Sequence, residues 1–224
     1  MNMKCAKTFF SLATVIFLAG CGNADNTTHD RVINQRTTSY PTSEMFLKRS
    51  STRAMSAEPI AHDQLMTLLD AAHWAPSSYN EQPWRFIYAH RDTPEWQQLF
   101  DLLVPFNQSW VKNASALVLF ASKKNFSEDN SYSPSHSFDT GAAWMSLALQ
   151  GSLMGLVVHG IGGFDYEKAR TVLNIPSDFD IEAMCAIGKP APADVLPEQM
   201  RKGETPSQRK PLSELVFHGA FGVK

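Results

Sequence analysis

Helical and strand periodicities alternate along the chain from about residue 43 onward. After Pro59, apolar side chains recur at the spacing of one helix face, which predicts a helix with a core-facing stripe. The stripe consists of Leu65, Leu68, Leu69 and Ala72. Shorter helices are predicted from Ser43, as an N-cap, through Lys48, and over 94–103 and 165–173.

Three apolar segments are typical of strands, at 85–89, 116–122 and 181–187. The second is an uninterrupted apolar run, so we expect it to be buried on both faces of a sheet. The segment 139–154 is the most apolar helix candidate, with apolar residues nearly all around its axis. Such a helix is buried on every side, which requires a central position or a second chain that covers it. A long proline-rich connection follows over 188–208, and connections of this length are usually functional or mobile.

The first 21 residues have the pattern of a targeting segment. Lys4 and Lys7 precede an apolar run that is too short to span a bilayer. The sequence Leu18-Ala19-Gly20-Cys21 resembles the bacterial lipobox, which implies lipidation of Cys21. We therefore expect three parts: a lipoprotein signal peptide over 1–20, a flexible polar tether over 21–42, and one packed domain over 43–224.

This interpretation implies a protein held at the cell envelope by a lipid anchor. The residue after Cys21 is Gly22 rather than Asp, which favours the outer membrane, at its periplasmic face, in a Gram-negative cell. Two alternatives stay open for the segment: an ordinary secretory signal, and a true start near Met45.

Charge and composition exclude several classes of function. A net charge of −2 and a pI near 6.4 provide no basic field, so no nucleic-acid partner is expected. With Cys5 removed and Cys21 acylated, Cys185 is the one remaining thiol, and its apolar surroundings favour a core hydrophobe. The histidines lack metal-ligand spacing, so no metal site is expected and His159 is interpreted as a core residue. The chain also has no G-x-S-x-G elbow and no phosphate loop, which argues against a hydrolase or a nucleotide triphosphatase.

Charged and hydroxyl side chains cluster just after the first predicted helix, in Arg49-Ser50-Ser51-Thr52-Arg53. Guanidinium groups bind phosphate oxygens through paired donors, and hydroxyl groups fix the orientation of the phosphate. The mixture therefore suits a phosphate group. A solvated helix end has a similar composition, so the cluster alone leaves both interpretations open.

A second polar segment separates the predicted helix after Pro59 from the first strand: Ala75-Pro76-Ser77-Ser78-Tyr79-Asn80-Glu81-Gln82-Pro83-Trp84. Proline, serine and asparagine are typical of turns, which is one explanation for this composition. The concentration of amide and hydroxyl groups beside an aromatic ring also suits a planar heterocycle that carries ring nitrogens and carbonyls.

Together the two polar segments are similar to the opening signature of the nitroreductase family. The similarity continues through 114–118, 139–143, 155–164 and 209–212, so it covers nearly everything between residues 46 and 222. The resemblance implies an α+β fold with a central, mostly antiparallel sheet flanked by helices. It also implies an intertwined homodimer with FMN sites at the interface, and oxidoreductase activity with NAD(P)H as the electron donor.

The resemblance assigns cofactor-binding roles to matching positions. It places Arg49 and Arg209 at the FMN phosphate, with Ser50 in the same cluster, and Arg53 near the pyrimidine edge of the flavin. The other matching positions line the ribityl chain and ring or run beside the reactive face: Ser51, Pro76, Ser77, Ser78, Asn80, Asn107, Ile161, Gly162 and Gly163. No side chain is expected to act as a catalytic acid, base or nucleophile, because the flavin carries the chemistry.

Two positions depart from the family pattern. Several members have a lysine where Trp110 aligns and a glutamate where Gly162 aligns, so local electrostatics and substrate orientation are expected to differ. Lys112 is a candidate to supply the missing positive charge.

The expected function is reduction of nitroaromatic, quinone or enone substrates by a flavin that accepts hydride from NAD(P)H. Export conflicts with this donor, because soluble NAD(P)H and FMN are mainly cytoplasmic. Two alternatives stay open: a flavin-binding surface protein without reductase turnover, and an oxygen-using relative of the same fold that fragments reduced FMN.

Overall fold

The computed structural model describes residues 36–223. The predicted signal peptide, Cys21 and most of the predicted tether lie outside the described residues. Within the described part of the chain, no helix combines the length and the apolar character needed to cross a membrane.

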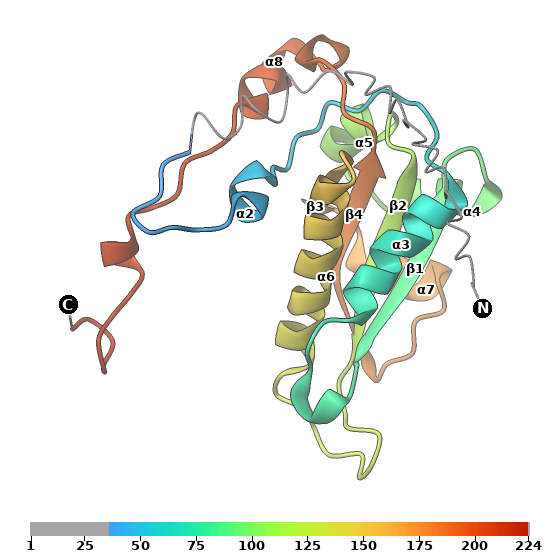
Figure 1. Cartoon of the computed structure of the whole chain (residues 1–224). Coiled ribbons are helices and arrows are strands. Elements are labelled where there is room, and N and C mark those ends of the chain that lie inside the picture. The colour runs from blue at the N-terminus through green and yellow to red at the C-terminus, as the bar shows by residue number, and fades with distance from the viewer. Residues whose placement is uncertain (1–35, 224) are drawn as a thin grey trace, which may run out of the picture.

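A four-stranded sheet forms the centre of the fold, with strand order β1-β2-β4-β3 (Figure 1). The strands are β1 (Trp84–His90), β2 (Ala116–Lys123), β3 (Val157–Ile161) and β4 (Phe179–Gly188). Every neighbouring pair is antiparallel, with a register shift between Phe120 and Ala121 where β2 pairs with β4. The predicted α+β fold with an antiparallel central sheet is therefore confirmed.

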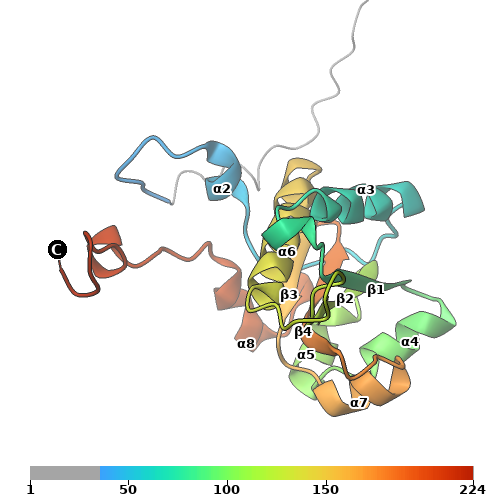
Figure 2. The same ribbon diagram turned by 90° about the horizontal axis from the view of Figure 1, so that it is seen from below.

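Two layers of helices cover the two faces of the sheet (Figure 2). On one face lie α3 (His62–His73) and the long α6 (His136–Leu153), and on the other lie α4 (Pro94–Phe100), α5 (Pro105–Val111) and α7 (Tyr166–Val172). Side chains of β2 alternate between the two cores, as the period of a strand requires. Leu117 and Leu119 pack in the core on the α4 side, whereas Val118 and Phe120 pack in the core against α3 and α6. The uninterrupted apolar run predicted for β2 is buried on both faces, as expected.

Local sequence explains where several helices begin. The α4 helix starts at Pro94, and the Thr93 side chain accepts a hydrogen bond from the Trp96 amide. The α7 helix is capped in the same way by Asp165, which accepts from the Lys168 amide. The short α2 (Glu44–Lys48) forms where predicted, but its N-cap Ser43 makes no side-chain capping bond.

Two predicted helix boundaries need correction. The helix predicted over 94–103 ends at Phe100, and α6 begins at His136, three residues before the predicted start. The α6 helix is also not buried on every side of a single chain, because Phe138 is 82% and Leu153 66% exposed. Its buried side packs on the sheet, and its other side needs a second chain if it is to be covered.

The segment predicted as a connection over 188–208 contains three short helical turns: η2 (Ala193–Val195), α8 (Glu198–Arg201) and η3 (Lys202–Glu204). Leu196 and Met200 anchor it in the core on the α4 side. Beyond it, residues 205–223 leave the body of the domain, and they contain only η4 (Leu212–Glu214) (Figures 1 and 2). This C-terminal arm exposes large apolar side chains: Leu212, Leu215, Val216 and Phe221.

Candidate functional site

Three arginines meet where α2 ends. One guanidinium nitrogen of Arg36 donates to the carbonyls of Leu47 and Arg49, each at 2.7 Å, and Arg49 donates to the Ser51 hydroxyl at 3.0 Å. Burial lowers the pKa of Arg49, and the positive charge of Arg209 lowers that pKa further. The pKa of Arg36 is lowered by burial and then by the charges of Arg209 and Arg49.

The three guanidinium groups repel one another, and none of them forms an ion pair with a carboxylate of residues 36–223. In the described part of the chain, the ion pairs of lysine and arginine involve other side chains: Lys48, Arg91, Lys124 and Lys189. Concentrated, uncompensated positive charge with planar donors is the arrangement that binds a phosphate. We refer to Arg36, Arg49 and Arg209 as the arginine cluster.

A second group of contacts surrounds Arg53. Its guanidinium lies over the Trp110 ring, and Trp110 also packs against His159, with ring centroids 4.7 Å apart. His159 is bonded through Nδ1 to the Thr52 carbonyl at 3.1 Å, so it is the satisfied core histidine that was expected. Burial lowers the pKa of His159, and the charge of Arg53 acts in the same direction. Glu204 holds the backbone here by accepting from the amide of Arg53 at 2.9 and 3.0 Å.

Asn107 joins this group to the end of β3. Its side-chain amide donates to the Gly163 carbonyl at 2.9 Å, and its oxygen accepts from the Trp110 indole at 3.3 Å. A Cβ at Gly163 would lie 2.7 Å from the Asn107 amide nitrogen, so the close approach requires glycine there. Four predicted positions therefore belong to one connected set: Arg53, Asn107, Gly162 and Gly163.

A cavity of about 350 Å³ lies between α6, β3 and β4. Its walls include Thr140, Gly141 and Trp144 of α6, and Gly160, Ile161 and Gly162 at the end of β3. The Thr140 hydroxyl and the Trp144 indole nitrogen are buried and have no hydrogen-bond partner, and the same holds for Nε of Arg53. Unsatisfied buried polar atoms are rare in folded proteins and call for a partner. The cavity thus offers donors to a polar molecule with an apolar body.

The cavity wall is open at the backbone of two glycines. A Cβ at Gly141 would meet nothing within 4 Å, and one at Gly162 would meet only the Tyr166 hydroxyl, at 4.0 Å. A flat molecule can therefore approach the backbone amides after β3 directly.

The polar bend over 76–82 lies at the N-terminal end of α6. The Ser78 amide donates to Asp139 of α6 at 3.0 Å, and the Gln82 amide donates to the Ser77 hydroxyl at 3.0 Å. Three residues without glycine's freedom adopt positive φ here: Tyr79 at 50°, Asn80 at 57° and Gln82 at 52°. Such a conformation costs free energy and is found mainly where the surroundings fix it, often at ligand sites.

Within one chain, the predicted residues form separate groups. The arginine cluster lies at the end of α2, beside the upper half of α6 in Figure 1, whereas the bend lies below the lower end of that helix. Ser50 is half-buried beside Arg49, and Pro76 is exposed at the start of the bend. Asp139 links the bend to Thr140 and hence to the cavity.

Several residues of the site were not predicted from sequence. Arg36 belongs to the segment expected to be a tether, where an isolated arginine gives no signal. Glu204 lies in the proline-rich connection, about 150 residues from the amides that it holds.

Residues 36–223 contain no group of three or more histidine, cysteine or acidic residues that could hold a metal ion.

The chain is similar in sequence to one family of known proteins. The sequence profile of the nitroreductase family matches residues 47–189, which include the segment 49–53, the bend and the cavity walls. The chain belongs to the nitroreductase family. It is 29% identical over 202 residues to an NADH dehydrogenase of Thermus thermophilus, with 76% of this chain and 92% of that protein covered.

Two further relatives carry flavin in their descriptions. The chain is 32% identical over 77 residues to the major NAD(P)H-flavin oxidoreductase of Aliivibrio fischeri, covering 33% of this chain and 35% of that protein. A crystal structure described as an oxidoreductase containing FMN is 44% identical, with a TM-score of 0.81. That similarity covers 85% of this chain and 98% of the other.

Proposed function

We propose that this nitroreductase-family protein is an FMN-dependent oxidoreductase that takes electrons from NAD(P)H and reduces small oxidised organic molecules. Nitroaromatics, quinones and enones are the proposed substrates. The observation that carries the proposal is the pairing of an uncompensated arginine cluster with a cavity whose wall is open at Gly162. The flavin content and NAD(P)H dependence named for the relatives support the same cofactor and donor.

The residues present fit FMN. Arg49 and Arg209 would hold the phosphate by charge-assisted hydrogen bonds, with Arg36 fixing the backbone of Arg49. The unpartnered Nε of Arg53 and the amide of Asn107 would face the polar edge of the flavin ring. The wall at Gly162 would admit its flat face.

The side chains of this protein would position the FMN and adjust its reduction potential, and they would not react themselves. When bound, FMN supplies hydride acceptance and donation. Arg53 would favour negative charge at the edge of a flavin ring by Coulomb attraction, and the buried Trp110 against which it packs would exclude water from that charge. Trp144 and Thr140 offer the hydrogen-bond donors that the cavity otherwise leaves unused.

The proposed working unit is a homodimer. One side of α6 and the C-terminal arm expose apolar residues, which soluble monomers rarely do over a contiguous surface. The separation of the arginine cluster from the bend within one chain supports an arrangement in which each site takes the two from different subunits.

Absorbance measurements on the chain beginning at Gly22 test the function. The proposal expects a yellow protein that bleaches with NADH or NADPH without oxygen and recovers its colour when menadione is added. A yellow protein that neither nicotinamide reduces would favour a binding protein without turnover. Breakdown of the flavin under oxygen would favour the flavin-fragmenting alternative, and a colourless protein that takes up no added FMN would reject all three.

We also propose that Cys21 is lipidated and holds the domain at the cell envelope, facing the periplasm. The lipobox-like sequence before Cys21 supports this, and the export that it implies would place the domain outside the cytoplasm, where soluble NAD(P)H is mainly found. Labelling with palmitate in a bacterial host should attach label to the protein and not to Cys21→Ser. Equal labelling of both proteins, or a soluble wild-type protein, would reject the anchor.

A further inference from the structure

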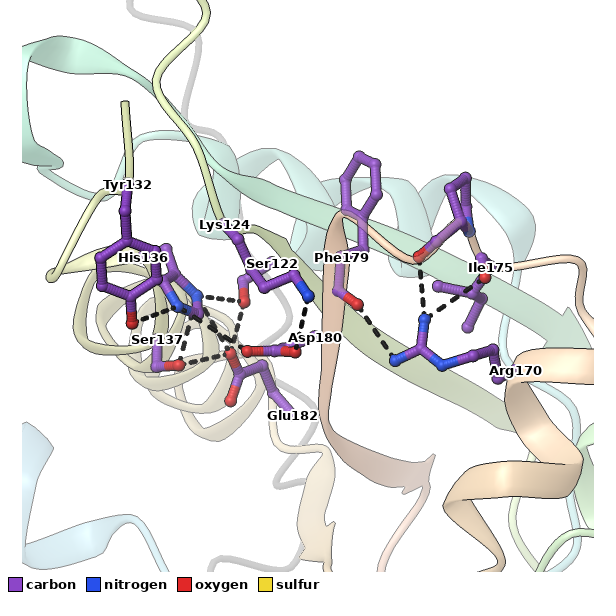
Figure 3. Close-up of polar contacts among 11 residues, drawn as sticks. Ser122, Lys124, Tyr132, His136, Ser137, Arg170, Ile175, Phe179, Asp180 and Glu182 are labelled. Atoms are coloured by element: carbon purple, nitrogen blue, oxygen red, sulfur yellow. Dashed lines mark hydrogen bonds and ion pairs between the residues drawn. The ribbon is translucent and has the colours of Figure 1, made fainter. Parts of the chain in front are cut away.

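A buried histidine, a buried serine and a glutamate form a hydrogen-bonded chain beside the cavity (Figure 3). His136 is the first residue of α6 and is 3% exposed, and Ser122 near the end of β2 is fully buried. The Ser122 hydroxyl lies 2.7 Å from Nδ1 of His136 and donates a short hydrogen bond to Oε1 of Glu182 on β4. Figure 3 shows the three side chains converging from the three elements.

The hydrogen bonds from His136 through Ser122 to Glu182 all donate in the same direction. A serine hydroxyl carries one proton, and in Ser122 this proton is used on Glu182. Nδ1 of His136 must then carry a proton and donate it to the Ser122 oxygen. Protons can therefore pass from His136 through Ser122 to Glu182.

One end of the chain reaches the cavity. Glu182 and Ser137 line the same cavity as Gly162, and the Ser137 hydroxyl donates to Oε1 of Glu182 at 2.7 Å. Ser122 and Ser137 both donate to Oε1 of Glu182, so neither of them bonds Oε2 of this carboxylate. Tyr166 lies nearby and donates to the Gly162 carbonyl at 3.3 Å, and its pKa is raised by burial and by the charge of Glu182.

The other end reaches solvent. Nε2 of His136 lies 3.4 Å from the Tyr132 hydroxyl and 3.8 Å from Oδ2 of Asp180. Both partners are accessible, because Tyr132 is 62% exposed and the Asp180 side chain 48% exposed. Lys124 pairs with Asp180 at 3.7 Å and completes the charged groups that face His136 (Figure 3).

We propose that Glu182, Ser122 and His136 form a proton relay that carries protons from solvent to a substrate reduced in the cavity. The proposal rests on the proposed reductase function. A quinone that receives a hydride gains two electrons and one proton, and it still needs one more proton to become a hydroquinone. Glu182 delivers that proton to the quinone oxygen, His136 restores it through Ser122, and water beside Tyr132 restores His136.

Rapid mixing of reduced protein with two oxidants tests the relay. Dithionite reduces the flavin in every variant, so the test does not depend on a nicotinamide donor. Menadione needs a proton on each oxygen, whereas ferricyanide takes single electrons and no proton. We expect Ser122→Ala and Glu182→Gln to slow oxidation by menadione about 10- to 100-fold relative to oxidation by ferricyanide. Equal slowing with both oxidants, or with neither, would overturn the relay.

Matched variants separate the relay from a loss of packing. Ser133 is also buried, and its hydroxyl bonds to that of Ser135 rather than to the relay, so Ser133→Ala should keep the wild-type ratio of the two rates. Glu182→Asp should recover part of the menadione rate. The menadione rate of the wild type should depend on pH, whereas that of Glu182→Gln should not. A shared pH profile would contradict the proposal.

The direction of these hydrogen bonds can be tested without turnover, by locating the proton of His136. Nitrogen-15 spectra of flavin-loaded protein near neutral pH should contain protected imidazole Nδ1–H signals from His136 and from His159, and only the signal of His136 should disappear in His136→Gln. It should persist in Ser133→Ala and be lost to solvent exchange in Ser122→Ala. Finding the proton of His136 on Nε2 alone would overturn the direction, and persistence in Ser122→Ala would overturn the link to serine. Failure of NADH to reduce the wild type would reject the proposed donor and leave these two tests intact.

Discussion

The guanidinium carbon of Arg53 lies 5.9 Å from the centroid of the Trp110 ring. The aromatic face attracts the cation without neutralising it, and Trp110 is itself fixed by its bond to Asn107. Trp110, which aligns with the lysine expected from the family resemblance, therefore carries no charge itself and supports the guanidinium of Arg53. The positive charge beside the proposed flavin edge comes from Arg53.

Removing the Arg53 charge should lower the reduction potential of the flavin. A cation near the ring stabilises the reduced, anionic form by about 1–2 kcal/mol at an effective dielectric constant of about 20. Arg53→Gln should accordingly lower the midpoint potential by about 20–40 mV for a two-electron couple, measured by dye-coupled titration. Lys112→Gln, which removes an exposed neighbouring charge, is the control, and an equal shift in both variants would count against Arg53.

The arginine cluster should discriminate FMN from riboflavin, which lacks the phosphate. Arg49→Ala should weaken FMN binding by about 1.5–3 kcal/mol, the range for a charge-assisted hydrogen bond, and leave riboflavin binding unchanged. Arg209→Ala should act in the same direction. Lys48→Ala removes a neighbouring cation that pairs with Glu44 and should change neither affinity. Fluorescence quenching of the flavin measures both ligands, and a parallel loss of the two would point to general damage.

Two adjacent glycines should respond differently to alanine. At Gly163 the new Cβ would lie 2.7 Å from the Asn107 amide nitrogen and 3.3 Å from Val104, so Gly163→Ala should lower stability by about 1–3 kcal/mol. Gly162→Ala meets no such contact and should unfold at the wild-type temperature, yet bind FMN less well. Calorimetry with and without FMN distinguishes the cases. Unchanged FMN binding by Gly162→Ala would remove that backbone from the site.

Acid should destabilise the fold partly through His159. Its pKa is lowered in the folded state, from an ordinary value of 6.5, by burial and by Arg53. As pH falls below about 6.5, the unfolded chain binds a proton that the folded chain resists, so stability is full above this pH and declines as the pKa of the folded state is approached. His159→Asn keeps a donor for the Thr52 carbonyl and should flatten the fall in melting temperature between pH 7 and 5. Parallel curves for the two proteins would exclude His159 as a contributor.

Deleting residues 205–224 should weaken the dimer and the hold on FMN together. The arm presents exposed apolar side chains and also carries Arg209, so its loss removes interface area and a phosphate ligand in one step. Sedimentation velocity should show a shift toward monomer relative to the full-length protein. Arg209→Ala is the matched control, because it should lose FMN affinity and remain dimeric.

Local patterns predicted the elements whose burial follows a simple period. The predicted core-facing stripe of α3 and the burial of β2 on both faces are correct. In both elements, burial determines which positions are apolar, so the local sequence contains the full pattern. The strand β3 and the helix α5 were not identified as elements: β3 has five residues with Gly160 inside, and α5 is seven residues long and starts at a proline. Such short elements form because β4 and the core on the α4 side cover them, which a local pattern does not reveal.

The candidate site was predicted where it follows a local motif and missed where it depends on distant contacts. The segment 49–53 stands out by its own composition, and the glycines after β3 were assigned through the family resemblance. Ser122 and Glu182 are 60 positions apart, and Glu182 shares an otherwise apolar strand with Asp180, a pattern that does not indicate Ser122 as a partner. Only the pairing of β2 with β4 brings the two together.

The position of Cys185 gives the central sheet a built-in reporter. Its thiol is fully buried in β4, and burial raises its pKa, so a thiol reagent cannot reach a reactive thiolate while the sheet is closed. No other cysteine occurs between residues 36 and 223. The speed at which this sulfur becomes modified therefore measures how often the middle of the molecule opens, with no label added to it.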